Sequence, residues 1–197
     1  MRILISIKGV SPLLMNRFTE QAEVAVGSGS RPSFAFSGNR GTPREQAEVK
    51  AYRDGEGNLY IPGPNIYSAI IAAGTFHKVG KNKLTTMKSS LVPAGIILEE
   101  LLCPLNTKHF EVDSRSVVIP STGGRIMCHR PRIDDWSLSF ILDVDGNMFS
   151  TDLVRALIDD AGKKIGLGDY RPSRKGPFGR FVVTEWKMVD RLLERAA

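Results

Sequence analysis

Hydrophobic residues recur at every second position in several segments of this chain, which is the pattern of half-buried strands. Ile3, Ile5 and Ile7 place apolar side chains on one face of the first such segment. Residues 136–144 repeat the pattern, with large apolar side chains on one face and serines on the other. The pattern predicts strands at residues 3–8, 59–61, 116–119, 125–133, 136–144 and 181–186.

Other segments show helical features. Apolar residues recur at intervals of three or four in residues 151–162, which predicts an amphipathic helix. Residues 65–73 are mostly small and apolar, which predicts a buried helix. Residues 42–52 begin Thr-Pro-Arg-Glu, the signature of a capped helix start. Residues 91–102 fit a strand and a helix equally well, so both stay open there.

In chain order the main elements run strand, helix, strand, strand, helix, strand, which is the order of the ferredoxin-like fold. We expect residues 125–133 and 136–144 to form its central antiparallel hairpin, turning at Asp134 and Asp135. The expected fold class is therefore α+β, an RRM-like βαββαβ domain with an antiparallel sheet. Its two helices would cover one face of the sheet and leave the other face for a partner.

The chain has 197 residues, which suits a single domain with insertions, and we expect one domain over residues 1–197. One insertion is expected at residues 19–57 after the first strand, and another at residues 78–124 between the first helix and the hairpin. The first holds arginines and phenylalanines that could pair with phosphates and stack on bases. The alternative is a loop whose phenylalanines lie on the core. The candidates there are Arg31, Phe34, Phe36 and Arg40.

The charge balance favours an acidic partner. The formal net charge is +6 and the pI is near 9.5, which fits nucleic acid first, with an anionic membrane or solubility alone as alternatives. Cys103 and Cys128 are far apart and lie beside apolar residues, which predicts free thiols in a reducing compartment, with one disulfide as the alternative. The histidines lack metal-ligand spacing, so no metal or cofactor is expected. We find no signal peptide or membrane span and expect a cytoplasmic protein.

A glycine-rich, cationic stretch between the second predicted helix and the last strand is the strongest candidate for a binding site. Glycine lets a backbone approach a ligand closely, and cations that neutralise phosphates release counterions. Its aromatic residues could stack on bases or only anchor the loop, and Asp169 could cap the loop by accepting N–H bonds. The alternative is a solvated loop whose glycines only satisfy turn geometry. The nucleic-acid-binding candidates are Lys163, Lys164, Gly166, Gly168, Tyr170, Arg171, Arg174, Lys175, Gly176, Phe178, Gly179 and Arg180.

A second basic group lies on the predicted strand before the hairpin turn. Arg130 and Arg132 occupy alternate positions and so share a face, whereas His129 points away. Both arginines are candidates for contact with nucleic acid. The alternative is an ordinary strand whose arginines form ion pairs with Asp134 or Asp135.

Two motifs resemble those of the RAMP superfamily, the RNA-binding proteins of CRISPR systems. Residues 166–181 resemble its glycine-rich loop, which lies between the last helix and the last strand of a ferredoxin-like domain. Here the spacer between Gly168 and Gly176 is longer than usual, and the second glycine pair is one residue wider. Residues 59–66, Leu-Tyr-Ile-Pro-Gly-Pro-Asn-Ile, look like the Ile-Pro-Gly-Ser segment that leads into the first helix of the backbone subunits. The usual basic residue in the first turn of that helix is missing.

This resemblance implies a subunit that grips guide RNA along its phosphates and assembles side by side into a filament. It also implies that residues 19–57 correspond to the inserted thumb or web of such subunits. We therefore expect a non-catalytic protein that binds single-stranded RNA, with DNA as an alternative, and that associates with itself or with other subunits. A phage or mobile-element relative that uses the domain on another nucleic acid is a further alternative.

Two other functions stay open. Some members of this superfamily cut RNA with a histidine as general base or with an aspartate and a metal ion. The residues that would serve an endoribonuclease here are His129, His77 and Asp54. No nucleophile motif and no paired-carboxylate spacing supports catalysis. The last alternative is a structural or interaction protein whose basic charge is incidental.

Overall fold

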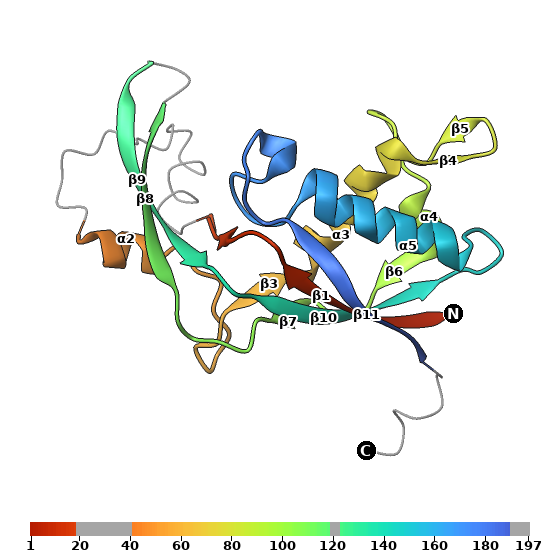
Figure 1. Ribbon diagram of the computed structural model, residues 1–197, viewed down its shortest axis with the longest axis horizontal. Coiled ribbons are helices and arrows are strands. Elements are labelled where there is room, and N and C mark those ends of the chain that lie inside the picture. The colour runs from red at the N-terminus through yellow and green to blue at the C-terminus, as the bar shows by residue number, and fades with distance from the viewer. Residues whose placement is uncertain (19–40, 119–122, 190–197) are drawn as a thin grey trace, which may run out of the picture.

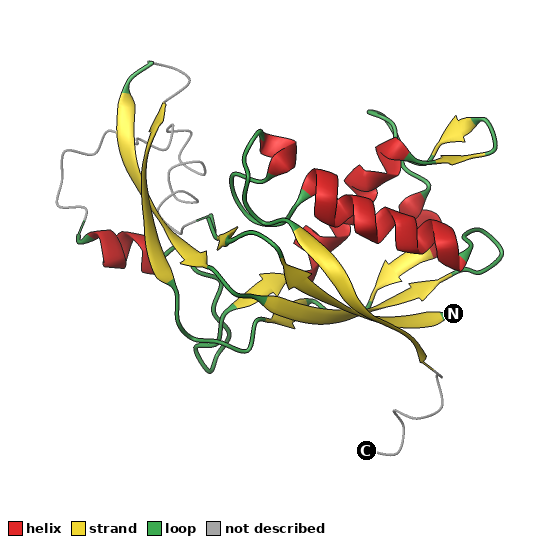
Figure 2. Cartoon of the chain, viewed as in Figure 1, coloured by secondary structure: helices red, strands yellow, loops and turns green. Residues whose placement is uncertain are grey.

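A four-stranded antiparallel sheet with two helices on one face forms the core of the protein (Figures 1 and 2). The computed structural model describes residues 1–18, 41–118 and 123–189. The core elements are β1 (Arg2–Gly9), α3 (Gly63–Ala73), β6 (Ile96–Leu98), β10 (Ser137–Val144), α5 (Thr151–Asp160) and β11 (Phe181–Val189). The strands lie in the order β11-β1-β10-β6, and with the two helices they follow the βαββαβ chain order. The predicted α+β, ferredoxin-like fold is confirmed.

The alternation along the central strands determines which face of the sheet the helices cover. Ile3, Ile5 and Ile7 of β1 are fully buried, and Phe140 of β10 lies opposite Ile5. Helices α3 and α5 pack on this face with their own buried apolar residues, such as Leu157. Each fully buried aliphatic or aromatic side chain contributes about 1.5–3 kcal/mol. This layer is therefore the main source of stability for the fold.

Helix α5 begins at a capped residue and delivers the chain into the glycine-rich loop. The Ser150 hydroxyl accepts a hydrogen bond from the Leu153 amide at 3.3 Å, which satisfies one N–H group at the helix start. The helix continues into the π-helical turn η2 (Ala161–Ile165), after which Gly166 adopts a φ of +76°. Because glycine adopts this left-handed conformation without a steric cost, the helix ends at Gly166 and the loop begins there.

A second sheet forms a ribbon that extends away from the core (Figure 1). Its strands are β2 (Leu13–Leu14), β8 (Glu111–Val118) and β9 (Arg125–Ile133), in the order β2-β9-β8. Strand β2 follows β1 closely in the chain and pairs with the end of β9. The ribbon therefore leaves the core beside the end of β1.

Helix α2 (Pro43–Glu48) packs against both long strands of the ribbon. Its start has the predicted capping box: the Glu45 amide donates to the Thr42 hydroxyl at 3.2 Å, and the Thr42 amide donates to the Glu45 carboxylate at 2.6 Å. The helix ends at Glu48, earlier than the predicted end at residue 52. The following residues turn instead, and Arg53 forms a bridge with Leu59.

The predicted hairpin of residues 125–133 and 136–144 is wrong. Strand β9 pairs with β8, whereas β10 pairs with β1 and β6. The chain passes from the ribbon into the core sheet at Trp136, which is buried and donates its indole N–H to the Ser11 carbonyl at 2.9 Å. Alternation identifies a strand but not its partner. Strand β9 carries too many polar residues to cover the core, so β6 takes the place beside β10 and β9 pairs with β8.

Strand β6, the short second strand of the core sheet, lies inside the range 78–124 that we expected to be one insertion. Between α3 and β10, the segments that lie outside the core order are therefore residues 74–95 before β6 and residues 99–136 after it. The remaining elements are β3 (Tyr60–Pro62), η1 (Gly74–Phe76), β4 (Lys78–Val79), β5 (Asn82–Lys83), α4 (Val92–Gly95), β7 (Leu102–Pro104) and η3 (Pro172–Arg174).

Part of the other expected insertion, residues 19–40 of 19–57, lies outside the described residues. Its assignment to a thumb or web therefore stays a prediction, as does the single domain over the whole chain. Within the described ranges, no helix combines the length and the apolar character needed to cross a bilayer.

We expect Cys103 to be unreactive in the native protein. Burial, together with the nearby Glu100 charge, raises the pKa of the Cys103 thiol to about 12. Because the thiolate is the reactive form, almost none is present at about pH 8. Mass spectrometry after iodoacetamide treatment should find Cys103 modified only after denaturation, whereas the partly exposed Cys128 serves as the internal comparison. Rapid modification of Cys103 in the folded protein would contradict this assignment.

Candidate nucleic-acid interface

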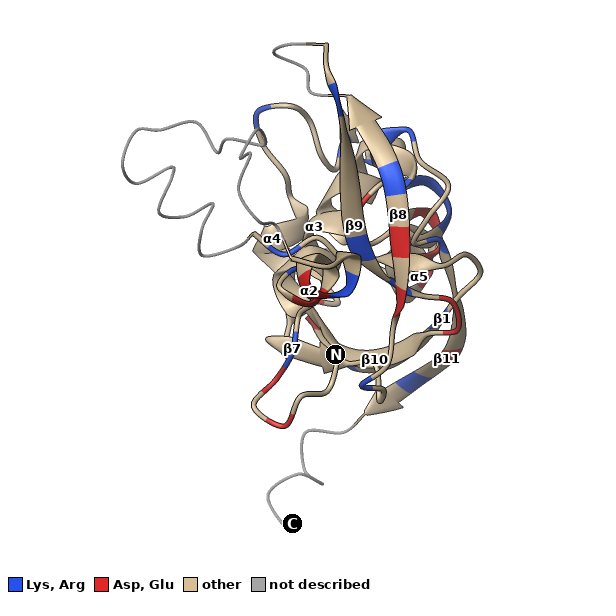
Figure 3. Cartoon of the chain, turned by 90° about the vertical axis from the view of Figure 1, so that its left-hand side faces the viewer, with Lys and Arg blue, Asp and Glu red and all other residues tan. Residues whose placement is uncertain are grey.

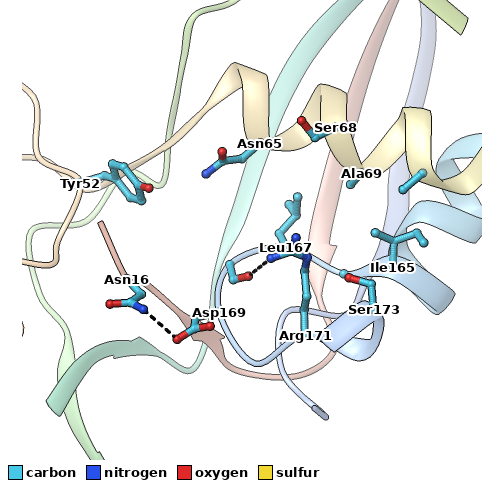
Figure 4. A pocket seen from close by; sticks show the side chains of 13 residues that line it. Asn16, Tyr52, Asn65, Ser68, Ala69, Ile165, Leu167, Asp169, Arg171 and Ser173 are labelled. Carbon is cyan, nitrogen blue, oxygen red and sulfur yellow. Dashed lines mark hydrogen bonds between the residues drawn. The ribbon is translucent and has the colours of Figure 1, made fainter. Parts of the chain in front are cut away.

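A pocket of about 340 Å³ lies between helix α3 and the glycine-rich loop, residues 166–180 (Figure 4). We call it the loop–helix pocket. The segment that leads into α3 and the glycine-rich loop were identified separately in the sequence, and both contribute to its lining. Its polar lining includes Asn16, Tyr52, Asn65, Ser68, Asp169 and Arg171.

The backbone of the loop is fixed by hydrogen bonds to other parts of the chain. The Leu167 amide donates to the Gly179 carbonyl at 2.9 Å, and the Asp169 amide donates to the Leu14 carbonyl at 2.8 Å. Gly168 has a φ of +72°, and a Cβ there would lie 2.3 Å from the Leu14 carbonyl oxygen. The loop glycines thus allow close packing, and these amides are not free to bind a phosphate.

Two residues other than glycine also hold left-handed conformations in this loop. Tyr170 has a φ of +47° and Lys175 a φ of +63°. Such conformations cost of order 1–3 kcal/mol and cluster at functional sites. Tyr170 is 40% exposed, whereas Phe178 is buried, and their ring centroids lie 6.0 Å apart. Tyr170 is therefore the aromatic residue of the loop that presents a surface for stacking, and Phe178 anchors the loop.

The guanidinium of Arg130 ties the ribbon to the loop. Its Nη1 lies 3.2 Å from Asp169 Oδ2, and its Nε donates to the Cys128 sulfur at 3.2 Å. Burial lowers the pKa of Arg130, but the hydrogen bond to Cys128 and the carboxylates of Asp169 and Asp113 outweigh it and raise the pKa overall. Arg130 is 6% exposed and paired inside the protein, so it is not part of a binding surface.

Asp169 is the loop residue on which these contacts converge. It accepts hydrogen bonds from the Asn16 side chain at 3.1 Å and from the Tyr170 amide at 2.8 Å, so its predicted capping role is confirmed. From β8, Arg115 places its guanidinium 4.8 Å from the centre of the Phe178 ring. Charged residues occupy every second position in the first part of β8, with Glu111 and Asp113 before Arg115, and Figure 3 shows the acidic part of the strand followed by a basic part. The ribbon therefore supports the loop through both charge and aromatic contacts.

Four predicted cations remain at the surface or in the pocket. Arg171 donates from Nη1 to the Gly168 carbonyl at 2.7 Å, and Figure 4 shows it extending from the loop toward α3. Lys163, Arg174 and Lys175 are exposed. No ion pair or side-chain hydrogen bond engages these three within the described ranges. Each lies within two residues of the pocket-lining Ile165 or Ser173 and carries a positive charge with no acidic partner among the described residues.

Other predicted cations are engaged by the protein itself. Lys164 pairs with Asp160 at 2.7 Å, and Arg180 donates to the Lys163 carbonyl. Arg132 pairs with Asp134 at 2.8 Å, as the alternative interpretation of that strand expected. The candidates of the first insertion, Arg31, Phe34, Phe36 and Arg40, lie outside the described residues.

The side chain of each catalytic candidate is already hydrogen-bonded to another group of the protein. Slight burial raises the pKa of Asp54, but hydrogen bonds from Asn58 and Glu56 outweigh it and lower the pKa, as expected for a turn-forming carboxylate. His129 Nδ1 lies 2.7 Å from the Ser114 hydroxyl. His77 contacts the Asp160 carboxylate at 3.0 Å. None of them lines the loop–helix pocket, and no metal-binding cluster occurs in the described part of the chain.

The sequence analysis missed Asn16, Tyr52 and Ser68 as pocket residues. Asn16 follows Leu13–Met15, so a polar residue after an apolar run was the available signal. Tyr52 reaches the pocket from the turn after α2, and no local pattern predicts that contact. Ser68 lies one helical turn after Asn65, so the two share a face of α3.

The fold is similar to that of a chain in the cryo-EM structure of the Type III-B Cmr-beta bound to cognate target RNA. The TM-score is 0.51 at 12% sequence identity, and the match covers 94% of this chain and 59% of that chain. The protein thus spans less than two thirds of the neighbour's length. At this identity the likeness concerns the fold, and it agrees with the ferredoxin-like architecture expected from the sequence. No protein-family model and no curated protein matches the sequence.

We expect Asp169→Ala to destabilise the protein, because it removes a partner of the buried Arg130 charge. An unpaired buried polar group costs about 1–3 kcal/mol. The matched control is Asp134→Ala, whose ion pair with Arg132 is more exposed and should contribute about 0–1 kcal/mol. Urea unfolding followed by circular dichroism measures both. Equal free energies of unfolding for the two variants would contradict the anchoring role of Asp169.

Proposed function

We propose that this protein is a non-catalytic subunit that binds single-stranded RNA at the loop–helix pocket and works within a multisubunit assembly. The observation that carries the proposal is that two motifs far apart in the sequence line one pocket. Each motif separately resembled a segment of RNA-binding RAMP subunits. Their meeting in space supports a shared role.

The chemistry of the pocket fits a nucleotide strand. Arg171 presents a planar guanidinium, which suits the two oxygens of a phosphate, while the exposed Arg174 and Lys175 follow the pocket-lining Ser173 in the chain and add positive charge there. Asn65 and Ser68 offer hydrogen-bonding groups from α3 that suit base edges or ribose hydroxyls. Tyr170 supplies an exposed ring on which a base can stack.

The open face of the core sheet does not offer the alternative RRM-type site. That mode of binding stacks bases on aromatic residues of the central strands. The central strands β1 and β10 contain one aromatic residue, Phe140, and it is buried under the helices. On the open face, Ser6 bonds to Ser139 at 2.9 Å and to Glu185 at 2.8 Å. The helix side, where the pocket lies, is therefore the better candidate.

Two features of the neighbour support RNA and an assembly in particular. The neighbour is a chain in the structure of the Type III-B Cmr-beta bound to cognate target RNA. The present chain shares the fold over 94% of its length. This likeness favours RNA over DNA as the ligand, whereas the cations in and next to the pocket suit the phosphates of either.

Replacing Arg171 and Arg174 by Glu should weaken binding of a labelled single-stranded RNA about 10- to 100-fold at about 0.1 M salt, because phosphate contacts are lost. The matched control, Lys108→Glu with Lys187→Glu, changes the net charge equally at exposed positions outside the pocket. Fluorescence anisotropy gives the Kd, and circular dichroism checks folding. An unchanged Kd in the folded Arg171/Arg174 variant would refute the pocket as the RNA site.

The RNA should remain intact during binding. Gel analysis after incubation, once with EDTA and once with Mg²⁺, should recover full-length RNA in both. Cleavage that disappears in His129→Ala, Asp54→Ala or His77→Ala would instead identify an endoribonuclease. If the protein does not cut RNA, the unmodified protein and the three variants should all leave the RNA at full length.

A further inference from the structure

A basic hairpin formed by β4 and β5 lies outside the site described so far. Residues 57–98 contain no aspartate or glutamate, and their charges are Lys78, Lys81, Lys83 and Lys88. All four lysines are exposed. Within the described ranges, no side-chain hydrogen bond or ion pair engages them. This segment therefore carries positive charge that no acidic residue in the described ranges neutralises.

The hairpin contributes no buried surface that would explain its presence. Every residue from 78 to 83 is exposed. Lys78 lies directly opposite Lys83 in the antiparallel register, an arrangement of like charges that destabilises a strand pair. An isolated two-stranded hairpin is marginal in water even without such a pair. A negatively charged partner would offset the repulsion between Lys78 and Lys83. Packing does not offset it, because the hairpin residues are exposed.

The β4–β5 hairpin follows, through η1, the end of α3 that lines the loop–helix pocket. Ala72 and Ile165 line the pocket, and η1 follows α3 directly and leads into β4. Lys164, next to Ile165, holds its ammonium group 4.5 Å from the centre of the Phe76 ring in η1. The residue next to the pocket-lining Ile165 therefore contacts η1, the turn that leads into the hairpin. In Figure 1 the hairpin projects outward beyond the end of α3.

We propose that an RNA strand held in the loop–helix pocket runs on across the β4–β5 hairpin, where Lys78, Lys81 and Lys83 neutralise its phosphates. This inference rests on the proposed function, because it extends the same strand beyond the same pocket. A row of cations without intervening acids suits a flexible polyanion, whose phosphates repeat along the strand. The hairpin then lengthens the bound RNA without adding base-specific contacts.

The test compares RNAs of two lengths, about 6 and about 20 nucleotides, a range that brackets typical single-strand site sizes. The hairpin variant is Lys78→Gln, Lys81→Gln and Lys83→Gln together. Its matched control, Lys8→Gln, Lys108→Gln and Lys187→Gln together, lowers the net charge equally at exposed positions elsewhere. Single-site Lys81→Gln at the hairpin turn provides a milder change if the triple variant is unstable.

The hairpin variant should bind the short RNA as the unmodified protein does and the long RNA at least about 10-fold more weakly at about 0.1 M salt. The slope of log K against log salt for the long RNA should become shallower by about 2 in the triple variant and about 0.7 in Lys81→Gln. The control variant should change neither the affinity for the two RNAs nor the salt dependence of binding.

Unchanged binding of the long RNA by the hairpin variant overturns the inference but leaves the pocket as the RNA site. Loss of binding to phosphatidylserine vesicles with unchanged RNA binding also overturns it, and assigns the hairpin to a membrane surface. If the unmodified protein binds neither RNA, the proposed function fails and the inference fails with it. If the Arg171/Arg174 variant alone loses both RNAs, the pocket is confirmed independently of the hairpin.

Discussion

The buried charge of Arg130 is the constraint on which the arrangement around the pocket depends. A guanidinium that is nearly inaccessible to water needs partners, and Asp169 of the glycine-rich loop supplies a carboxylate at 3.2 Å in addition to Asp113 on the neighbouring strand β8. This pairing requires the ribbon and the loop to take one relative position. Asn16, two residues after β2, bonds to the same carboxylate. Three parts of the chain that are distant in sequence are thereby fixed around one side of the pocket.

Local patterns in the sequence were sufficient for most elements but not for their pairing. The alternation in β1 and β10, the Ser150 cap of α5 and the capping box of α2 all act within a few residues, so they could be found by inspection. Strand β6 is only three residues long and leaves almost no periodic signal. Missing it led to the wrong hairpin, because the sheet then lacked a strand and β9 seemed to supply it. The partner of a strand depends on distant contacts that no local pattern contains.

The site was predictable to a similar extent. The glycine-rich loop and the segment leading into α3 were recognisable, and both line the pocket. Which cations remain exposed was only partly predictable. Lys164 pairs with Asp160 four residues earlier and Arg132 with Asp134 two residues later, so these pairs are local, whereas Arg130 finds Asp169 only through the tertiary fold. The role of the glycines differs from the one expected from the sequence. They were expected to bring the backbone close to a ligand, whereas Gly168 brings it close to the chain itself.

The closed hydrogen-bonding of the loop backbone has a consequence for recognition. Because the amides of Leu167, Asp169 and Gly179 are already bonded to neighbouring carbonyls, the loop acquires its shape when the protein folds. A partner arriving later meets a rigid template and loses little affinity to ordering the backbone. Selectivity then resides in side chains such as Arg171 and Tyr170, which can be exchanged during evolution while the turn that carries them keeps its form.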